Sequence, residues 1–173
     1  MNIRYCLTLL GAASLLLGTV TAAEPASEFT TTDPKKCKLI SEGAYSFKYR
    51  CPGMGGYGVV FEGSHGRSWI TLDYDGETID MMDAALNACP GEFPAKANDV
   101  IQWRGYRKGG KFMPYAMIYR MKSSVEGKPI ETLVVVQLAG SGSKVIGGVP
   151  SNKGGNEAAE KLADKECGHL VDP

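Results

Sequence analysis

Glycine-rich turns divide most of this chain into short segments in which apolar and polar residues alternate. A period of two places alternate side chains on opposite faces of an extended backbone, which is typical of half-buried β-strands. We expect strands at residues 45–50, 57–62, 68–74, 100–107, 112–122, 131–138 and 144–149. The composition, with 43% hydrophobic and 22% charged residues, excludes a wholly disordered chain.

Glycine pairs mark the tightest turns. Asp75-Gly76 is a strong hairpin signal, and Gly109-Gly110 separates two further strand segments. After Asp75-Gly76 the chain either returns as a strand at 77–81 or forms a short helix over 80–88, because both patterns are present. We expect a long loop at 84–99, where Pro and Gly residues cluster.

The C-terminal segment carries a helical pattern. Asn156 suits the N-cap and Gly168 the position after the helix, while the apolar side chains at 159, 162, 163 and 167 share one face. The continuous apolar run Leu133–Val136 predicts a central strand. The fold class expected is therefore α+β and mostly β: an antiparallel sheet of about six or seven strands with one C-terminal helix. A sandwich or a small barrel is the alternative.

The first 23 residues are typical of a secretory signal peptide. Arg4 precedes an apolar run, and the small residues Thr21-Ala22-Ala23 follow it. The domain organisation expected is a signal peptide at 1–23, a flexible Thr-rich lead-in at 24–36, and one β-rich domain at 37–173. This order predicts a periplasmic or secreted protein with no transmembrane segment after cleavage.

Four cysteines remain after the leader, and an exported chain favours disulfides between them. Three pairings are possible. We favour Cys37–Cys51, which closes a hairpin-sized loop, and Cys89–Cys167, which would tie a mid-chain loop to the C-terminal helix.

The stretch Cys51-Pro52-Gly53-x-x-Gly56-Tyr57 resembles a group of small secreted bacterial proteins. Further points of likeness are Val59, Glu62-Gly63, Gln102-Trp103-Arg104, Pro114-Tyr115-Ala116 and Leu133-Val134-Val135. The resemblance implies an exported β-rich domain. It implies no activity and no site residues.

Sequence patterns that could indicate cofactor or metal sites have simpler interpretations. The glycines of Gly53–Gly58 match G-x-G-x-x-G, but a strand pattern follows instead of a helix, which favours a β-turn over a dinucleotide site. The cysteines lack the spacing of a zinc site, and the carboxylates near Asp75 lack that of a calcium loop. We therefore expect no cofactor and no metal. Met113, Tyr115, Met117, Tyr119 and Met121 would share one strand face, which suits core packing.

Charge is unevenly distributed along the chain. Lys+Arg and Asp+Glu both number 19, which argues against a nucleic-acid binder, yet residues 100–125 contain basic residues and no acid. The charged residues of the segment 62–92 are acidic except for Arg67. Aromatic residues interleave with the basic ones, so the candidate binding residues around Gly109-Gly110 are Trp103, Arg104, Tyr106, Arg107, Lys108 and Lys111. Alternatively, the basic and acidic segments are neighbouring strands that pair internally.

These observations favour an exported, non-enzymatic binding domain that contacts an envelope component or a protein partner. An inhibitor of a secreted hydrolase is one form of this function. The alternative is a small periplasmic hydrolase that uses carboxylates, since the fold alone brings such pairs together. A concave site with convergent titratable groups would favour the enzyme.

We predict that export removes the leader after Ala23, because small residues precede the point where the chain turns polar at Glu24. Mass spectrometry of the protein purified from the envelope should give a chain that begins at Glu24. An intact terminus at Met1 would contradict this prediction.

Overall fold

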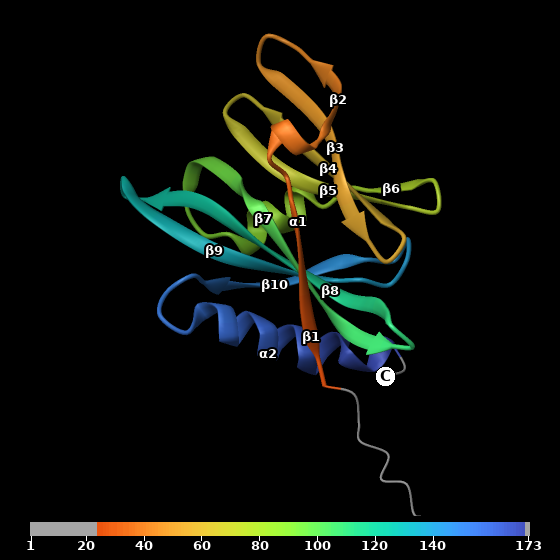
Figure 1. Ribbon diagram of the computed structural model, residues 1–173. Coiled ribbons are helices and arrows are strands. Elements are labelled where there is room, and N and C mark those ends of the chain that lie inside the picture. The colour runs from red at the N-terminus through yellow and green to blue at the C-terminus, as the bar shows by residue number, and fades with distance from the viewer. Residues whose placement is uncertain (1–23, 172–173) are drawn as a thin grey trace, which may run out of the picture.

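The computed structural model describes residues 24–171, apart from the side chains of residues 93 and 94. The predicted signal peptide at 1–23 lies outside the described residues. Ten strands form two five-stranded antiparallel sheets (Figure 1). The first, which we call the middle sheet because it lies between the other sheet and the C-terminal helix, has the order β1 (Ala26–Thr31), β7 (Glu92–Lys108), β8 (Lys111–Val125), β9 (Lys128–Gln137), β10 (Lys144–Pro150). The outer sheet has the order β2 (Lys38–Glu42), β3 (Ser46–Met54), β4 (Tyr57–Ser64), β5 (Arg67–Tyr74), β6 (Glu77–Ile79).

Helix α2 (Gly155–Cys167) covers the face of the middle sheet that points away from the outer sheet (Figure 1). The short helix α1 (Met82–Ala88) follows β6, so the chain uses both of the alternatives that its sequence left open there. Single turns of 3-10 helix occupy Pro34–Lys36 and Gly168–Leu170. The predicted class, α+β and mostly β, is confirmed, with more strands than expected and a sandwich as the arrangement.

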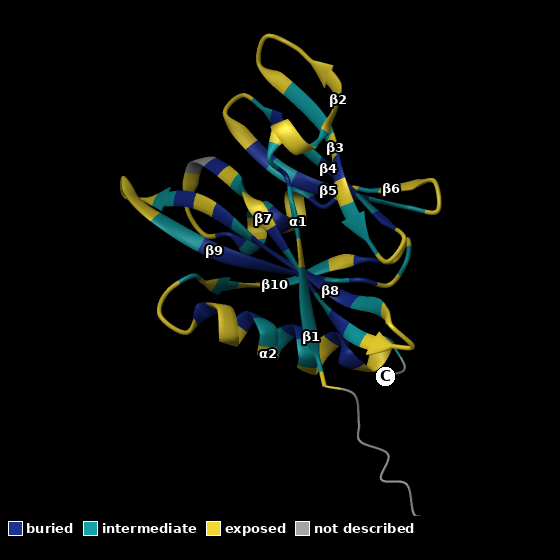
Figure 2. Ribbon diagram, viewed as in Figure 1, coloured by how far each residue is buried: buried dark blue, intermediate teal, exposed yellow. Residues whose placement is uncertain are grey.

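Strand β9 shows why the middle sheet needs cover on both faces. Val134 and Val136 lie in the core between the two sheets, while Leu133 and Val135 lie in the core beneath α2. Side chains alternate across a strand, so an uninterrupted apolar run fits only where both faces are buried. The middle of β8 and β9 is accordingly buried in Figure 2.

The turns follow the glycine signals closely. Asp75 and Gly76 both have positive φ, as do Gly109 and Gly110, which is the backbone of type I′ hairpin turns. Helix α2 also turns Ala159, Ala163 and Cys167 into the core, as its sequence pattern predicts. Its N-cap is Gly154 with positive φ, so Asn156 falls inside the first turn instead.

The Thr-rich segment predicted as a flexible lead-in is a strand instead. Residues Ala26–Thr31 form β1, an edge strand paired with β7. Its polar side chains bind β7: Thr30 Oγ1 accepts a hydrogen bond of 2.8 Å from the indole of Trp103. Hydroxyl groups of this segment form hydrogen bonds with the neighbouring strand, so the segment lacks apolar alternation. Its sequence pattern therefore did not predict a strand.

Most of the predicted loop at 84–99 is likewise regular structure. Strand β7 begins at Glu92, and its pairing with β8 shifts register twice between Glu92 and Ile101. Bulges of this kind disturb the alternation that would indicate a strand, so the clustered Pro and Gly residues led to the prediction of a loop.

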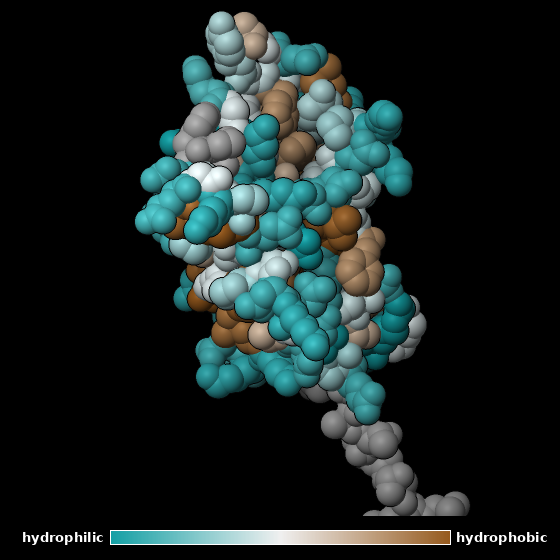
Figure 3. All heavy atoms as spheres, turned by 90° about the vertical axis from the view of Figure 1, so that its left-hand side faces the viewer, coloured by the Kyte–Doolittle hydropathy of each residue, from teal (hydrophilic) through white to brown (hydrophobic). Residues whose placement is uncertain are grey.

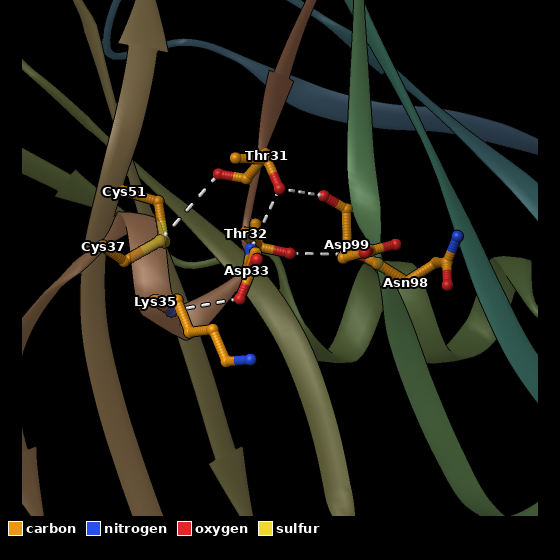
Figure 4. Close-up of a disulfide and its surroundings, with 8 residues drawn as sticks. All are labelled: Thr31, Thr32, Asp33, Lys35, Cys37, Cys51, Asn98 and Asp99. Atoms are coloured by element: carbon orange, nitrogen blue, oxygen red, sulfur yellow. Dashed lines mark hydrogen bonds between the residues drawn. A yellow bond between two sulfur atoms is a disulfide. The ribbon is translucent and has the colours of Figure 1, made fainter.

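The disulfide Cys37–Cys51 is present, as predicted (Figure 4). It closes the base of the hairpin formed by β2 and β3. Beside it, Thr31 Oγ1 donates to the carbonyl of Asp99 at 2.8 Å and Thr32 Oγ1 donates to that of Asn98 at 3.1 Å. These hydrogen bonds tie the end of β1, which precedes Cys37 in the chain, to β7.

The predicted disulfide Cys89–Cys167 is wrong, because both residues are buried free thiols. Cys89 belongs to the core between the two sheets, and Cys167 belongs to the core beneath α2. The middle sheet separates these cores, whereas a disulfide needs Cα atoms within about 7 Å of each other.

We therefore predict two thiols in the exported chain. A thiol assay without reductant should detect about two after denaturation, and almost none in the native state, since Cys89 and Cys167 are buried. Reduction before denaturation serves as the control and should raise the number to about four, because Cys37 and Cys51 are then released. An absence of thiols in the denatured, unreduced chain would restore the second disulfide.

Candidate binding surface

The six residues predicted as a basic-aromatic binding surface do not lie together on the surface. Trp103 is fully buried in the core between the sheets, and its ring contacts Tyr57. Arg104, the next residue of β7, points the opposite way, beneath α2. Its side chain is only 13% exposed. Both residues are therefore part of the interior of the molecule.

Arg104 joins the middle sheet to α2 through Asp164. Its Nε and Nη2 donate to the two carboxylate oxygens of Asp164, each at 2.7 Å. The Tyr115 hydroxyl, from β8, donates to the same carboxylate at 2.5 Å. Glu160, one helical turn before Asp164, accepts from Gln102 Nε2 at 2.6 Å. Side chains of β7 and β8 thus bind one side of the helix at two positions, one helical turn apart.

These contacts shift the ionisation of all three partners. The hydrogen bond to Asp164 raises the pKa of Arg104. Burial and the hydrogen bond to Asp164 raise the pKa of Tyr115. Partial burial alone would raise the pKa of Asp164, but the hydrogen bonds from Arg104 and Tyr115 outweigh it and hold that pKa below its ordinary value. The group is thus a structural ion pair between sheet and helix.

The other predicted residues lie at the end of the β7–β8 hairpin. Tyr106 is half-buried and packs on Tyr115, with ring centroids 5.1 Å apart. Arg107, Lys108 and Lys111 are exposed. Arg107 pairs with Glu28 of β1, and its guanidinium lies 5.7 Å from the centroid of the Phe112 ring. The exposed part of the predicted surface is therefore limited to the hairpin tip.

The acidic segment 62–92 is not the partner of the basic strands. Glu62 and Asp73 pair with Lys48 and Arg50 on the outer sheet, at 3.3 and 2.7 Å. Basic residues of the middle sheet pair instead with acids of β1, β9 and α2; Arg120, for example, binds Glu131 of β9 at 2.7 Å. Charged residues of both the basic and the acidic segment form ion pairs within the molecule, but their partners differ from those predicted.

The hairpin of β2 and β3 exposes apolar side chains that sequence analysis did not select. Leu39 and Ile40 are 47% and 45% exposed, and Tyr45 at the turn is 75% exposed. Strand β2 is an edge strand in which every residue is exposed, and it lies at the far end of the molecule from α2 (Figures 1 and 2). The sequence signal was the pair Cys37 and Cys51 flanking this segment.

A row of aromatic rings continues from this hairpin onto the inner face of the outer sheet. The Phe47 ring lies 5.7 Å from that of Tyr49 and 5.0 Å from that of Phe61. Gly63 makes room for this row, because a Cβ there would lie 2.3 Å from the Phe47 ring. All three rings are only partly buried, so the row forms the margin of the core between the sheets.

The row opens into a cleft between the outer sheet and β7, which we call the aromatic cleft. Its volume is about 260 Å³. The described residues that line it are Tyr45, Phe47, Phe61, Ser64, Gly66, Arg67, Ser68, Lys96 and Ala97. On the side of the molecule that lies at the left in Figure 1, Figure 3 shows hydrophobic side chains in the upper part set among hydrophilic ones.

Metal-binding groups and membrane-spanning helices are not found among residues 24–171. In that range, His, Cys, Asp and Glu side chains do not gather in a group of three or more that could hold a metal ion. Its helices are also too short or too polar to cross a membrane.

Comparison with known protein families, with curated proteins and with solved structures finds no match to this chain. The resemblance to small secreted bacterial proteins therefore stays a prediction.

We predict that Arg104→Ala destabilises the protein far more than Arg107→Ala. The first change leaves the partly buried Asp164 without its two charge-assisted hydrogen bonds, and should lower the free energy of unfolding by about 2–3 kcal/mol. The second removes an exposed ion pair with Glu28 and should cost at most about 1 kcal/mol. Denaturant unfolding at pH 7 measures both, and equal losses would contradict the assigned role of Arg104.

The pH dependence of stability tests the other partner of this ion pair, Asp164. The folded-state pKa of Asp164 is lowered, so its contribution is present above the unfolded value of about 4 and is lost as the pH falls through the folded value. The stability difference between the unmodified protein and Asp164→Asn should therefore shrink below about pH 4. A difference that grows on acidification would reverse the predicted sign.

Proposed function

We propose that this protein is an exported, non-enzymatic binding domain whose partner surface is the disulfide-closed hairpin of β2 and β3. The observation that carries the proposal is the exposure of Leu39, Ile40 and Tyr45 together on one projecting edge hairpin. Side chains of this kind exposed close together mark interaction surfaces more often than isolated ones do. The partner is a protein of the cell envelope, and an inhibitor of a secreted hydrolase is one form that this function takes.

The disulfide supports the proposal in two ways. Disulfides persist in oxidising compartments, so Cys37–Cys51 is consistent with export to the periplasm or beyond. It also restrains a hairpin whose strand β2 buries none of its residues. A surface that is rigid before binding loses less conformational entropy when a partner docks, which favours affinity.

The hairpin tip that carries Arg107, Lys108 and Lys111 is the weaker candidate surface. Arg107 is engaged by Glu28 and Phe112, and the buried Trp103 and Arg104 hold the layers together. A role in steering an anionic partner is compatible with such exposed charges, since steering needs potential and not direct contact.

The hydrolase alternative draws no support from the groups whose pKa is most perturbed. Arg104, Tyr115 and Asp164 bind one another between sheet and helix, and Tyr119 and Cys167 are buried in the two cores. None of these five residues is among those described as lining the aromatic cleft. A general acid or base needs access to a substrate, and the aromatic cleft gives it to none of these five.

We predict that Tyr45→Ser and Ile40→Ser each weaken capture of the envelope partner by about tenfold or more. Exposed aromatic and aliphatic residues that become buried at an interface contribute most of its binding energy. The mature chain is immobilised, partners from envelope extract are identified by mass spectrometry, and affinity for the purified partner is then measured.

Phe29→Ser provides the matched control, because Phe29 is 62% exposed but lies on the middle sheet, away from the hairpin. It should leave the affinity within about twofold. Loss of binding in Phe29→Ser together with full binding in Tyr45→Ser and Ile40→Ser would move the interface to the middle sheet.

A further inference from the structure

We infer that the aromatic cleft binds a small amphiphilic anion: a carboxylate attached to an aromatic ring or to a short hydrocarbon chain. This inference rests on the proposed binding function and adds a small ligand to it. Three features of the cleft carry it, namely an apolar floor, a cationic margin and a limited volume.

The floor of the cleft is aromatic and only partly covered. Phe47 and Phe61 pack at 5.0 Å with their planes inclined by 52°, and Tyr45 extends the aromatic surface to the turn of the hairpin. The Tyr45 ring is itself held by stacking on His65, with centroids 5.8 Å apart and planes 17° from parallel. Rings fixed in this way present apolar surface that a hydrocarbon group would remove from water.

The margin of the cleft is positive. Arg67 and Lys96 lie on opposite sides of it, on β5 and β7, and the described lining residues include no carboxylate. The cross-strand neighbour of Lys96 on β8 is Lys122, which pairs with Glu131 of β9 at 3.8 Å, so the positive charge of this margin is that of Arg67 and Lys96. An anionic group at this margin complements the charge, while the same hydrocarbon group with a cationic head does not.

The volume limits the ligand. A cleft of about 260 Å³ lies just below the usual range for sites that hold drug-sized molecules. One or two fused rings, or a chain of about ten carbons, is the size that such a space suits. The floor and the margin are adjacent, so the ring or chain would lie on Phe47 and Phe61 with the carboxylate toward Lys96.

The test is a calorimetric titration of the mature chain with three probes. Decanoate and 2-naphthoate carry the carboxylate on a chain and on a ring, and decyltrimethylammonium carries the same chain on a cation. We expect one or both anions to bind, and the cation to bind at least about tenfold more weakly. The stronger anion identifies which hydrocarbon group the site takes. Equal binding of decanoate and decyltrimethylammonium, or no binding of either anion, would overturn the inference.

Two variants locate the site. Lys96→Glu reverses a charge at the margin of the cleft and should weaken anion binding by about tenfold or more. Lys111→Glu makes the same change at the tip of the β7–β8 hairpin and should alter it by less than about twofold. Both positions are exposed, so thermal unfolding should show that each variant folds. Equal effects of the two variants would place the anion elsewhere and overturn the inference.

The anion titration and the partner experiment can fail independently of each other. Ile40 does not line the cleft, so Ile40→Ser should reduce partner capture and leave anion binding unchanged. Partner capture without anion binding would remove only the ligand inference. Anion binding with partner capture that is insensitive to Tyr45→Ser and Ile40→Ser would remove only the proposed protein interface.

Discussion

Burial of the middle sheet on both faces is the constraint on which the other two layers depend. A strand such as β9, with Leu133, Val134, Val135 and Val136 all buried, is stable only where apolar cover is present on each side. The outer sheet supplies that cover on one face and α2 on the other. Consecutive residues of β7 make the two contacts. Trp103 points to the outer sheet, where its ring contacts Tyr57, and its indole binds Thr30 within the middle sheet. Arg104 points to α2 and binds Asp164.

The outer sheet is covered less completely than the middle sheet, and its exposed part is where we propose the binding surface. Its inner face is buried near Val59 and Ile70, but the rings of Phe47 and Phe61 at its margin are only partly buried. Strand β2 lies beyond this margin and buries none of its residues. Covalent closure by Cys37–Cys51 stabilises the hairpin where packing does not. A cross-link closing a loop of this length, with a sequence separation of 14, contributes about 3 kcal/mol through its effect on the unfolded chain.

Local patterns in the sequence were enough to predict the strands with clear alternation, the turns at Asp75-Gly76 and Gly109-Gly110, and the buried face of α2. They could not assign a side chain to one of two buried faces. Tyr115 was expected on the same face as Met117 and Tyr119, but it lies beneath α2 while they lie between the sheets. The register of β7 against β8 shifts between Arg104 and Gly105, opposite Pro114, and this bulge turns Tyr115 to the other face. A bulge depends on pairing between strands, which no single segment records.

The candidate site escaped prediction for a related reason. Trp103 and Arg104 have the composition of an exposed binding strip, and only packing against other layers, the outer sheet for Trp103 and α2 for Arg104, makes them interior residues. The sequence signal for the contact between Arg104 and α2 was weak but present: Glu160 and Asp164 are four residues apart, and flank the apolar face that contains Ala159 and Ala163. Acidic residues beside the buried face of a helix indicate basic partners on the element that the helix covers. The exposed hairpin of β2 and β3, in contrast, contains ordinary strand residues. Its proposal as a binding surface depends on the lack of cover over its side chains, which the sequence of the hairpin does not show.

The three layers also restrict which cysteines can form a disulfide, and this restriction is not visible in their spacing along the chain. Cys167 lies on the opposite face of the middle sheet from both Cys89 and the Cys37–Cys51 disulfide, so any pairing with Cys167 requires the sheet and helix to separate. Burial raises the pKa of the Cys167 thiol to about 11, so this thiol stays protonated at pH 7. Exchange between Cys167 and the Cys37–Cys51 disulfide is therefore suppressed in the folded chain by geometry and by ionisation together.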